Sequence, residues 1–469
     1  MQTDTQPNLS TARNIKIGFF HLGSGMADVI TTGVWNRIMI SDLGFAATPI
    51  GLLVALRYFL APIGVWAGRM SDRMAIGGYR RLFWIWLGRG MMAVSIAILG
   101  FATAHVARGN AADLMTWVVL TLALLLFSLG NAFSGSTFLA LIYDRSAEHQ
   151  RGRAVGIVWT FLLLGFTIGG VFFGLLLPSS DAHPEGTMGV LKFTPETITN
   201  LFLIGATVMG SLWFFSLLGE ERRSRTDGST ASHAESEHAT TLKSDLKLAW
   251  SSRQTRFFFW YLALSMMFAF TQDLILEPFA ADVFEMSAST TSRFAAYWGS
   301  MAILGTIVFL ILSRRFKWLT NTVMNYLGVG ILVLTFALFA LSSFAEIRWL
   351  VTPGLILLGI GLGIWNVGTL GLMMDMSPFG KAGTFLGFWT LVVTLARGSG
   401  VAGGGILRDI GYQISGTYTA SYGAVFLIGA IGLGVALWAL SQVNVRAYKA
   451  EAQIEETRDT AKILAGAMD

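Results

Sequence analysis

The sequence predicts an all-α polytopic membrane protein with twelve transmembrane helices arranged as two six-helix pseudo-repeats. Its 469 residues are 54% hydrophobic and only 13% charged, whereas a soluble globular protein carries about 25% charged residues. Twelve apolar runs are long enough to cross a bilayer as a helix, which takes about 20 residues. A set of residues also recurs at one constant offset between the two halves. Together these observations exclude a water-soluble fold.

The apolar runs fall into two sets of six. In the first half we expect helices near 15–40, 47–67, 82–106, 114–142, 153–177 and 198–219. In the second half we expect them near 257–281, 294–313, 321–344, 347–374, 383–406 and 419–442. The stretch between the sets is rich in Ser, Thr, Glu and Arg, which is typical of a linker. The expected division is a bundle at 1–219, a linker at 220–256, a bundle at 257–442 and a tail at 443–469.

The lysines and arginines predict the orientation in the membrane. With these spans, 24 of the 33 lie on the side of the N-terminus, the linker and the tail, and five lie on the other side. Cytoplasmic segments of membrane proteins carry an excess of Lys and Arg. Both termini and the linker are therefore expected in the cytoplasm. The net charge of +5 follows this topology, so it does not indicate a nucleic-acid partner.

The two halves repeat one another. Asp144 and Ser146 follow the fourth span, and Asp375 and Ser377 follow the tenth, at an offset of 231 residues. Pairs of glycines share this offset, which favours an internal duplication. Parallel six-span repeats are the architecture of major facilitator superfamily (MFS) transporters, whose binding site lies at the midplane between the halves. The sequence therefore predicts the MFS fold.

The loop between the second and third spans resembles the MFS cytoplasmic signature GxxxDRxGRR, slightly stretched. Its acid and arginines suit a latch that joins the two helix bundles through charge-assisted hydrogen bonds. The alternative is ordinary anchoring by positive charge on the cytoplasmic side. The predicted latch residues are Gly68, Asp72, Arg73, Arg80 and Arg81, with Asp144 and Asp375 from the repeated loops.

Several longer stretches resemble one MFS branch, the PucC or bacteriochlorophyll delivery family. Span 1 ends with Asn36-Arg37-Ile38-Met39-Ile40, and span 2 contains Leu56-Arg57 followed by Ala61-Pro62. Span 7 carries the string Gln272-Asp273-Leu274-Ile275-Leu276-Glu277-Pro278-Phe279, which is unusual for a membrane helix. Around span 11 the matching positions are Gly383, Gly387, Trp389, Gly398, Gly400 and Arg408-Asp409.

This resemblance implies a function in pigment handling. It implies a membrane carrier or assembly chaperone for bacteriochlorophyll or chlorophyll, acting during light-harvesting complex assembly in the inner (cytoplasmic or photosynthetic) membrane of a bacterium. The implied partners are antenna polypeptides or a pigment-synthesis enzyme, besides the lipid bilayer, with the pigment as bound cargo. Two alternatives stay open: an ion-coupled transporter of a small solute, and a scaffold that binds assembly partners without pigment.

The residues give no sign of catalysis. The chain has no cysteine, which excludes disulfides, thiolate metal sites and cysteine nucleophiles. The sequence has no hydrolase, metalloprotease or nucleotide-binding motif. We therefore expect a protein that is not an enzyme, with no catalytic cofactor and no metal site.

Charged residues inside the spans are few, and each needs a partner because a charge at the centre of a membrane helix costs about 2.5–3.5 kcal/mol. Counting depth along each helix predicts that Asp28 pairs with Arg57, and that Glu277 pairs with Arg37 or Arg397. These pairs either fix helix register and gate the bundles, or bind a coupling proton. The predicted set is Asp28, Arg37, Arg57, Asp273, Glu277 and Arg397, to which Arg89 in span 3 adds a further cation.

If the cargo is a chlorophyll, its magnesium needs an axial ligand and its ring needs an apolar surface. His21 is the one histidine well inside a span, seven residues before Asp28 and on nearly the same face. It is the candidate ligand, the alternative being a hydrogen bond between helices. Trp365, Asn366 and Trp389 lie deep in the second half and are the candidates for a wall that faces the cargo.

Overall fold

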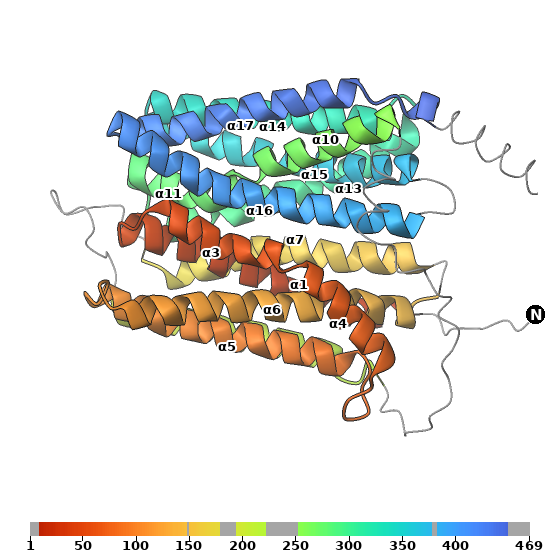
Figure 1. Cartoon of the computed structure of the whole chain (residues 1–469), viewed down its shortest axis with the longest axis horizontal. Helices are drawn as coiled ribbons and strands as arrows, with labels where there is room; N and C mark the ends of the chain where they lie inside the picture. The colour runs from red at the N-terminus through yellow and green to blue at the C-terminus, as the bar shows by residue number, and fades with distance from the viewer. Residues whose placement is uncertain (1–8, 148–149, 179–193, 222–251, 378–381, 449–469) are drawn as a thin grey trace, which may run out of the picture.

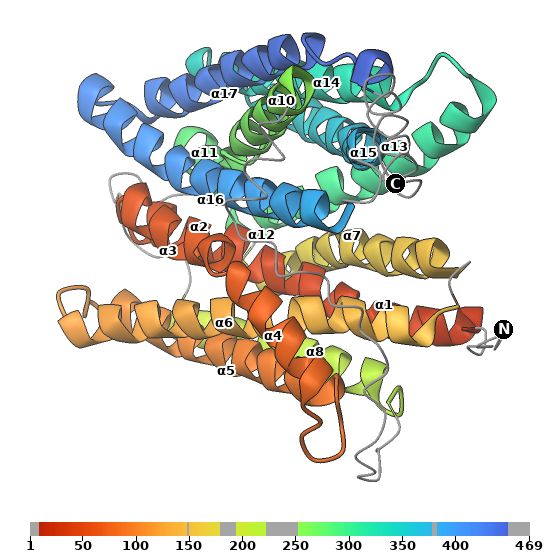
Figure 2. The same cartoon turned by 45° about the vertical axis from the view of Figure 1, so that its right-hand side comes forward.

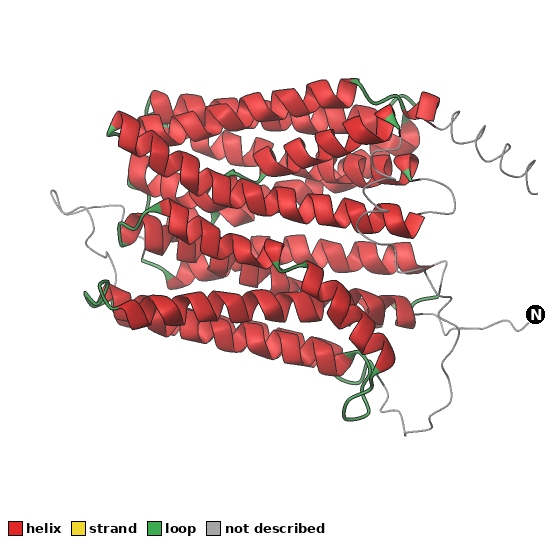
Figure 3. Ribbon diagram, viewed as in Figure 1, coloured by secondary structure: helices red, strands yellow, loops and turns green. Residues whose placement is uncertain are grey.

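The computed structural model describes residues 9–147, 150–178, 194–221, 252–377 and 382–448. Within these ranges the chain is helical apart from its connecting turns, and one isolated bridge joins Ile76 and Tyr79 (Figure 3). Eleven helical stretches are long and apolar enough to cross a membrane. A twelfth runs without interruption from Thr11 to Asp42. The predicted all-α fold is therefore confirmed, while most of the predicted linker and tail lies outside the described residues.

The N-terminal bundle contains six spans. The first two are composite, and the other four are single helices. They are α1 (Thr11–Asp28), η1 (Val29–Val34), α2 (Trp35–Arg37) and η2 (Ile38–Asp42); α3 (Ala47–Phe59) and α4 (Pro62–Arg73); α5 (Leu82–Ala107); α6 (Leu114–Arg145); α7 (Arg151–Leu176); and α8 (Pro195–Leu217).

The C-terminal bundle contains the other six. Three of its spans are preceded or interrupted by a short break. They are α10 (Arg253–Ala269) and α11 (Gln272–Phe284); α12 (Ala288–Ser292) and α13 (Phe294–Arg315); α14 (Asn321–Phe344); η4 (Arg348–Leu350) and α15 (Val351–Met376); α16 (Ala382–Ser415); and α17 (Tyr418–Ser441).

Local sequence explains where the helices start and break. Pro62 occupies the first turn of α4, where its missing N–H costs nothing, and it separates α4 from α3. Hydroxyl and carboxylate side chains accept backbone N–H groups at several N-termini; the capping residues are Ser10, Asp113, Thr194, Ser252, Ser287, Thr320 and Thr417. Helices α6 and α16 run past the predicted ends at 142 and 406, because a helix continues into water where hydropathy has already fallen.

The two bundles lie side by side (Figures 1 and 2), with the N-terminal bundle in red to yellow-green and the C-terminal bundle in green to blue. The main contacts between them are those of α3 with α16, of α7 with α12 and α13, and of the η1–α2 segment with α11. We call the side that holds the start of α1, the end of α8 and the start of α10 the linker side, at the right of Figure 1, and the opposite side the far side.

The bundles are joined at the far side. The carboxylate of Asp409 on α16 accepts the backbone N–H groups of Ala47 (3.0 Å) and Thr48 (2.7 Å) at the start of α3. Arg37 Nη1 donates to Thr291 Oγ1 of α12 at 2.7 Å. Each of these hydrogen bonds runs from one bundle to the other, and each lies near the far-side ends of its helices.

Toward the linker side the bundles separate. Phe166 and Gly170 of α7 pack against α13, where the Phe166 and Trp298 rings are 4.8 Å apart. Trp159 projects from the same face of α7. It stands seven residues before Phe166 and eleven before Gly170, so it is nearer the linker side, and it is 45% exposed. A buried face that becomes exposed along one helix means that its partner has moved away. The structure is therefore closed at the far side and open toward the linker side.

Candidate functional site

A cluster of polar side chains lies between the bundles near the middle of the spans. Asp28 comes from α1, and Arg57 and Tyr58 come from α3 in the N-terminal bundle. Asp273 follows the break between α10 and α11, and Arg397 comes from α16. We call these five residues the midplane cluster.

The pair that depth predicts between Asp28 and Arg57 is formed. Arg57 Nη1 donates to Asp28 Oδ1 at 2.8 Å, and Nη2 donates to the hydroxyl of Tyr58 at 2.7 Å. The Arg57 side chain is 7% exposed, whereas that of Asp28 is 31% exposed. The carboxylate therefore reaches the space between the bundles while its cation is buried behind it.

The second pair of the cluster joins Arg397 to Asp273, with Nη2 to Oδ2 at 3.0 Å. The Arg397 side chain is 31% exposed, and its guanidinium also lies over the ring of Phe270 at 4.0 Å. The ring of Tyr58 lies 4.7 Å from the Arg57 guanidinium and 5.1 Å from that of Arg397. One tyrosine thus stands between two cations that belong to different bundles.

The prediction that Glu277 pairs with Arg37 or Arg397 is wrong. Arg397 is bound to Asp273, and Arg37 Nε lies 3.3 Å from Asp42 Oδ2. The reason is local: Arg37 and Asp42 are five residues apart, and the π-helical turn η2 brings such residues onto one face. Depth counted along a straight α-helix cannot anticipate that turn.

A second polar group at the far side was not expected from the sequence. Arg408 binds Asp282 (3.2 Å) and Asp409 (2.9 Å), and the hydroxyl of Tyr422 donates to Asp282 at 2.6 Å. These acids stand at the ends of their spans, so a search for charges inside the membrane passes over them. The string Arg408-Asp409 was the available signal.

The candidate pigment ligand His21 is partly buried on the face of α1 that also carries Asp28. Its ring lies 4.8 Å from that of Phe138 on α6 and 5.8 Å from that of Trp159 on α7. Its one described hydrogen-bond contact is with Ser24 Oγ, at 3.5 Å. The imidazole therefore stands among aromatic rings at the edge of the space between the bundles.

The three candidates in the C-terminal bundle lie in different surroundings. Trp365 is 2% exposed, and its indole N–H donates to Tyr261 (3.0 Å) inside the bundle. Asn366 is exposed. On the circumference of α15, its side chain lies in the sector between two neighbours: Trp365, which faces α10, and Gly359, which packs on α13. Because α13 contacts the N-terminal bundle, this sector faces the space between the bundles. Trp389 is partly buried, and its indole N–H has no acceptor among the described residues.

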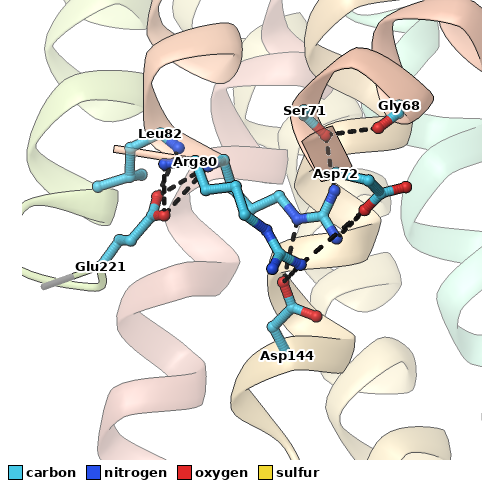
Figure 4. Close-up of polar contacts among 8 residues, drawn as sticks. Gly68, Ser71, Asp72, Arg80, Leu82, Asp144 and Glu221 are labelled. Carbon is cyan, nitrogen blue, oxygen red and sulfur yellow. Dashed lines mark hydrogen bonds and ion pairs between the residues drawn. The ribbon is translucent and has the colours of Figure 1, made fainter. Parts of the chain in front are cut away.

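The predicted latch forms a linker-side cluster within one bundle (Figure 4). Arg81 binds Asp72, Asp144 (3.0 Å) and the hydroxyl of Ser71 (2.6 Å), which in turn donates to the carbonyl of Gly68. Arg80 lies 3.7 Å from Asp144. The described partners all belong to the N-terminal bundle, so in this conformation the cluster joins α4, α5 and α6 rather than the two bundles.

The other two predicted latch residues lie apart from this network. Arg73 is exposed and is outside the described contacts of the cluster. Asp375, in the C-terminal bundle, accepts the side-chain amide of Asn321 at 2.8 Å. The repeated loops therefore use the equivalent acids Asp144 and Asp375 with different partners.

The first residues after α8 complete the linker-side cluster. The carboxylate of Glu221 accepts the backbone N–H groups of Arg80 (2.7 Å), Arg81 and Leu82 (2.7 Å) and so caps α5 (Figure 4). Glu220 binds Arg13 (2.6 Å) and Lys16 (3.1 Å) of α1. Both anchors were missed from the sequence because these acids look like part of a polar linker.

The ion pairs share one property: in the described part of the chain, both partners of each pair belong to the same bundle. The described side-chain hydrogen bonds between the bundles instead join a charged or hydroxyl side chain to a neutral group. Besides the contacts of Asp409 and Arg37, Ser292 donates to the carbonyl of Gly170 at 3.3 Å. Separating the bundles would therefore break neutral contacts and leave the ion pairs intact.

Comparison with known proteins connects this architecture to one family. A family model described as PUCC protein matches residues 34–448. Protein PucC of Rhodobacter capsulatus is 26% identical over 439 residues, which cover 91% of each chain. A Rhodobacter capsulatus protein named bacteriochlorophyll synthase 44.5 kDa chain is 27% identical over 397 residues, covering 82% of this chain and 84% of that one.

Solved structures agree with the fold. A bacterial homologue of the human lysosomal transporter Spinster superposes with a TM-score of 0.70 at 14% identity, covering 93% of this chain and 98% of the other. At this identity the likeness establishes the fold alone, which is that of the MFS transporters. The site described above is thus held on a fold that this chain shares with that solved structure.

Proposed function

This chain belongs to the PUCC protein family, and from that premise we propose that it is a membrane carrier or assembly chaperone that handles bacteriochlorophyll or chlorophyll during light-harvesting complex assembly. The observation that carries the proposal is the family match over most of the chain, joined to a relative named bacteriochlorophyll synthase 44.5 kDa chain. The proposed setting is the inner membrane of a phototrophic bacterium, with both termini in the cytoplasm. The excess of Lys and Arg on the linker side supports that orientation.

The geometry supports a cargo site between the bundles, open toward the linker side. His21 offers an imidazole to the pigment magnesium, and the rings of Phe138 and Trp159 stand beside it. Asn366 faces the same space, and the indole N–H of Trp389 is a donor without an acceptor among the described residues. Trp365 supports this wall from inside the C-terminal bundle. The proposed function includes no catalytic step: the protein binds its cargo and releases it.

The proposed partners are antenna polypeptides or a pigment-synthesis enzyme, which would receive or supply the pigment. Two other functions compete with pigment handling. An ion-coupled transporter of a small solute is favoured by the transporter fold and by the charged midplane cluster. A scaffold for assembly partners would need no pigment at all.

The test is an absorption spectrum of the protein purified in mild detergent from a pigment-producing phototroph. Wild type is compared with His21→Ala and with the control His105→Ala, which changes an exposed histidine at the far end of α5. We expect stoichiometric pigment on wild type and the control, and little on His21→Ala. Equal pigment on all three would keep pigment handling and reject His21 as the ligand. Absence of pigment from all three, with the fold intact, would favour the transporter or the scaffold.

A further inference from the structure

One acid at the bundle interface forms no ion pair with any residue that the structure describes. Glu277 lies on α11, which packs against η1 of the other bundle, and it is 7% exposed. Its Oε1 lies 3.1 Å from the point where a Cβ on Gly33 would stand, so the missing side chain of that glycine makes room for the carboxyl group. The group is therefore held between the bundles, against backbone of the opposite bundle.

The cations around α11 are already bound by other acids. In the N-terminal bundle, Arg37 on α2 binds Asp42, and Arg57 on α3 binds Asp28. On α16 of the C-terminal bundle, Arg397 binds Asp273. Arg408, on the same helix, binds Asp282 and Asp409. The segments η1 and α12, which also pack against α11, carry no ionisable side chain, and α17 contributes tyrosines. Among the described residues, Glu277 forms no ion pair. The nearby acid Asp273, one turn away on the same face, makes a second negative charge there still less favourable.

A carboxylate without a cation is costly to bury, and such groups bind a proton instead of staying charged. We propose that Glu277 is a proton-binding site, and that its proton holds the far side closed. Opening the far side would separate α11 from η1 and admit water to the carboxyl group. In water the carboxylate is stable, so opening releases the proton and closing takes one up.

This site gives the two bundles a proton-dependent equilibrium. Low pH favours the closed far side, because the neutral carboxyl group fits the buried position. High pH favours opening, because the ionised group must reach water. The inference does not depend on the identity of the cargo, and its test needs no pigment, so it can fail while the proposed function stands.

The absence of cysteine allows specific labelling at chosen positions. Spin labels at Ala111→Cys, after α5, and Gln413→Cys, near the end of α16, would report the distance between the bundles at the far side; both positions are exposed. In purified full-length protein we expect a short distance at low pH and a growing population of a longer one as pH rises. Glu277→Gln should keep the short distance throughout and lose the pH response.

The matched control is Glu285→Gln, which removes an exposed acid at the end of the same helix and should follow wild type. A wild-type distance that does not change with pH, or a Glu277→Gln protein that still follows pH, would overturn the proposal. If Glu277→Gln does not fold, the infrared spectrum of wild type decides. The band of a buried protonated carboxyl group should disappear as pH rises and shift in Glu277→Asp, and its absence would reject the site.

Discussion

Asp28 and Arg57 form an ion pair whose two members differ in burial, so removing them should have unequal effects. Asp28→Asn leaves the Arg57 guanidinium buried without an anion, and we expect it to lower the free energy of unfolding by about 3 kcal/mol. Arg57→Gln leaves an acid that is 31% exposed and reaches water, so its cost should be smaller. Denaturant unfolding in detergent measures both. The double variant should regain part of the loss, and equal losses in the two single variants would contradict this account.

At this scale the sequence predicted one ion pair and missed others. Asp28 and Arg57 share a depth, and residue counting finds that. Asp42, Asp282 and Asp409 lie at the ends of spans, where a charge looks ordinary, although each binds an arginine in the folded protein. Glu277 was assigned a cation because depth alone does not say which acids have already taken the arginines.

Helix α7 packs closely against the C-terminal bundle at Gly170, where a larger side chain would not fit. A Cβ on Gly170 would lie 2.8 Å from the backbone nitrogen of Ala296 and 2.9 Å from the carbonyl of Ser292, and backbone cannot move aside as a side chain can. Gly170→Leu should therefore push α13 away and lower the free energy of unfolding by about 1–3 kcal/mol. Gly156→Leu on the same helix has nothing within 4 Å and serves as the control. Thermal unfolding in detergent should separate the two variants, and equal melting temperatures would count against tight packing.

The start of α5 depends on a residue that follows α8. Glu221→Ala removes the carboxylate that accepts three backbone N–H groups, and a helix cap is worth about 1 kcal/mol. Amide hydrogens at Arg80, Arg81 and Leu82 should then exchange about fivefold faster. Glu220→Ala, which frees Arg13 and Lys16 instead, should leave these amides unchanged. Unaltered exchange in Glu221→Ala, followed by mass spectrometry, would show that the cap contributes little.

Hydropathy predicted the twelve spans but not their internal breaks. The turns η1 and η2 replace α-helix in span 1, and Phe270 and Thr271 separate α10 from α11. Such breaks leave the run apolar, so composition does not reveal them. They matter because they set which face Arg37, Asp42 and Asp273 present.

At the scale of the whole molecule, the carboxylate of Asp409 joins the two bundles by accepting two backbone N–H groups of α3. Asp409→Asn weakens the charge-assisted hydrogen bonds from Ala47 and Thr48 of the other bundle, and we expect about 1 kcal/mol less stability for the closed far side. The spin-label pair at 111 and 413 should show about a fivefold rise in the open population. Asp113→Asn is the control, because that acid caps α6 within its own bundle. Identical distance distributions in wild type, Asp409→Asn and Asp113→Asn would show that Asp409 does not stabilise the closed far side.

The repeat of 231 residues predicted two bundles, and the structure has them. It did not predict which side is closed, since that depends on contacts such as Asp409 with Thr48, 361 residues apart in sequence. The string Arg408-Asp409 is part of the family resemblance, but nothing in it indicates Thr48 as the partner of Asp409. The predicted latch around Asp72 and Arg81 likewise looked like a bridge between bundles, yet it lies on the side where they are apart.

Because each described ion pair is contained in one bundle, its charges move together when the bundles rock. One elementary charge that crosses the whole membrane field is worth about 2.3 kcal/mol per 100 mV, but a neutral pair carried as a unit transfers almost none. The midplane cluster therefore gives the membrane voltage no direct means of driving the conformational change. Charge movement that accompanies the change is expected instead from two groups outside these pairs: the proton on Glu277, and the guanidinium of Arg89, which is 4% exposed, lies over the rings of Phe20 and Trp213, and forms no ion pair among the described residues. These are the groups through which the membrane voltage can act on the equilibrium.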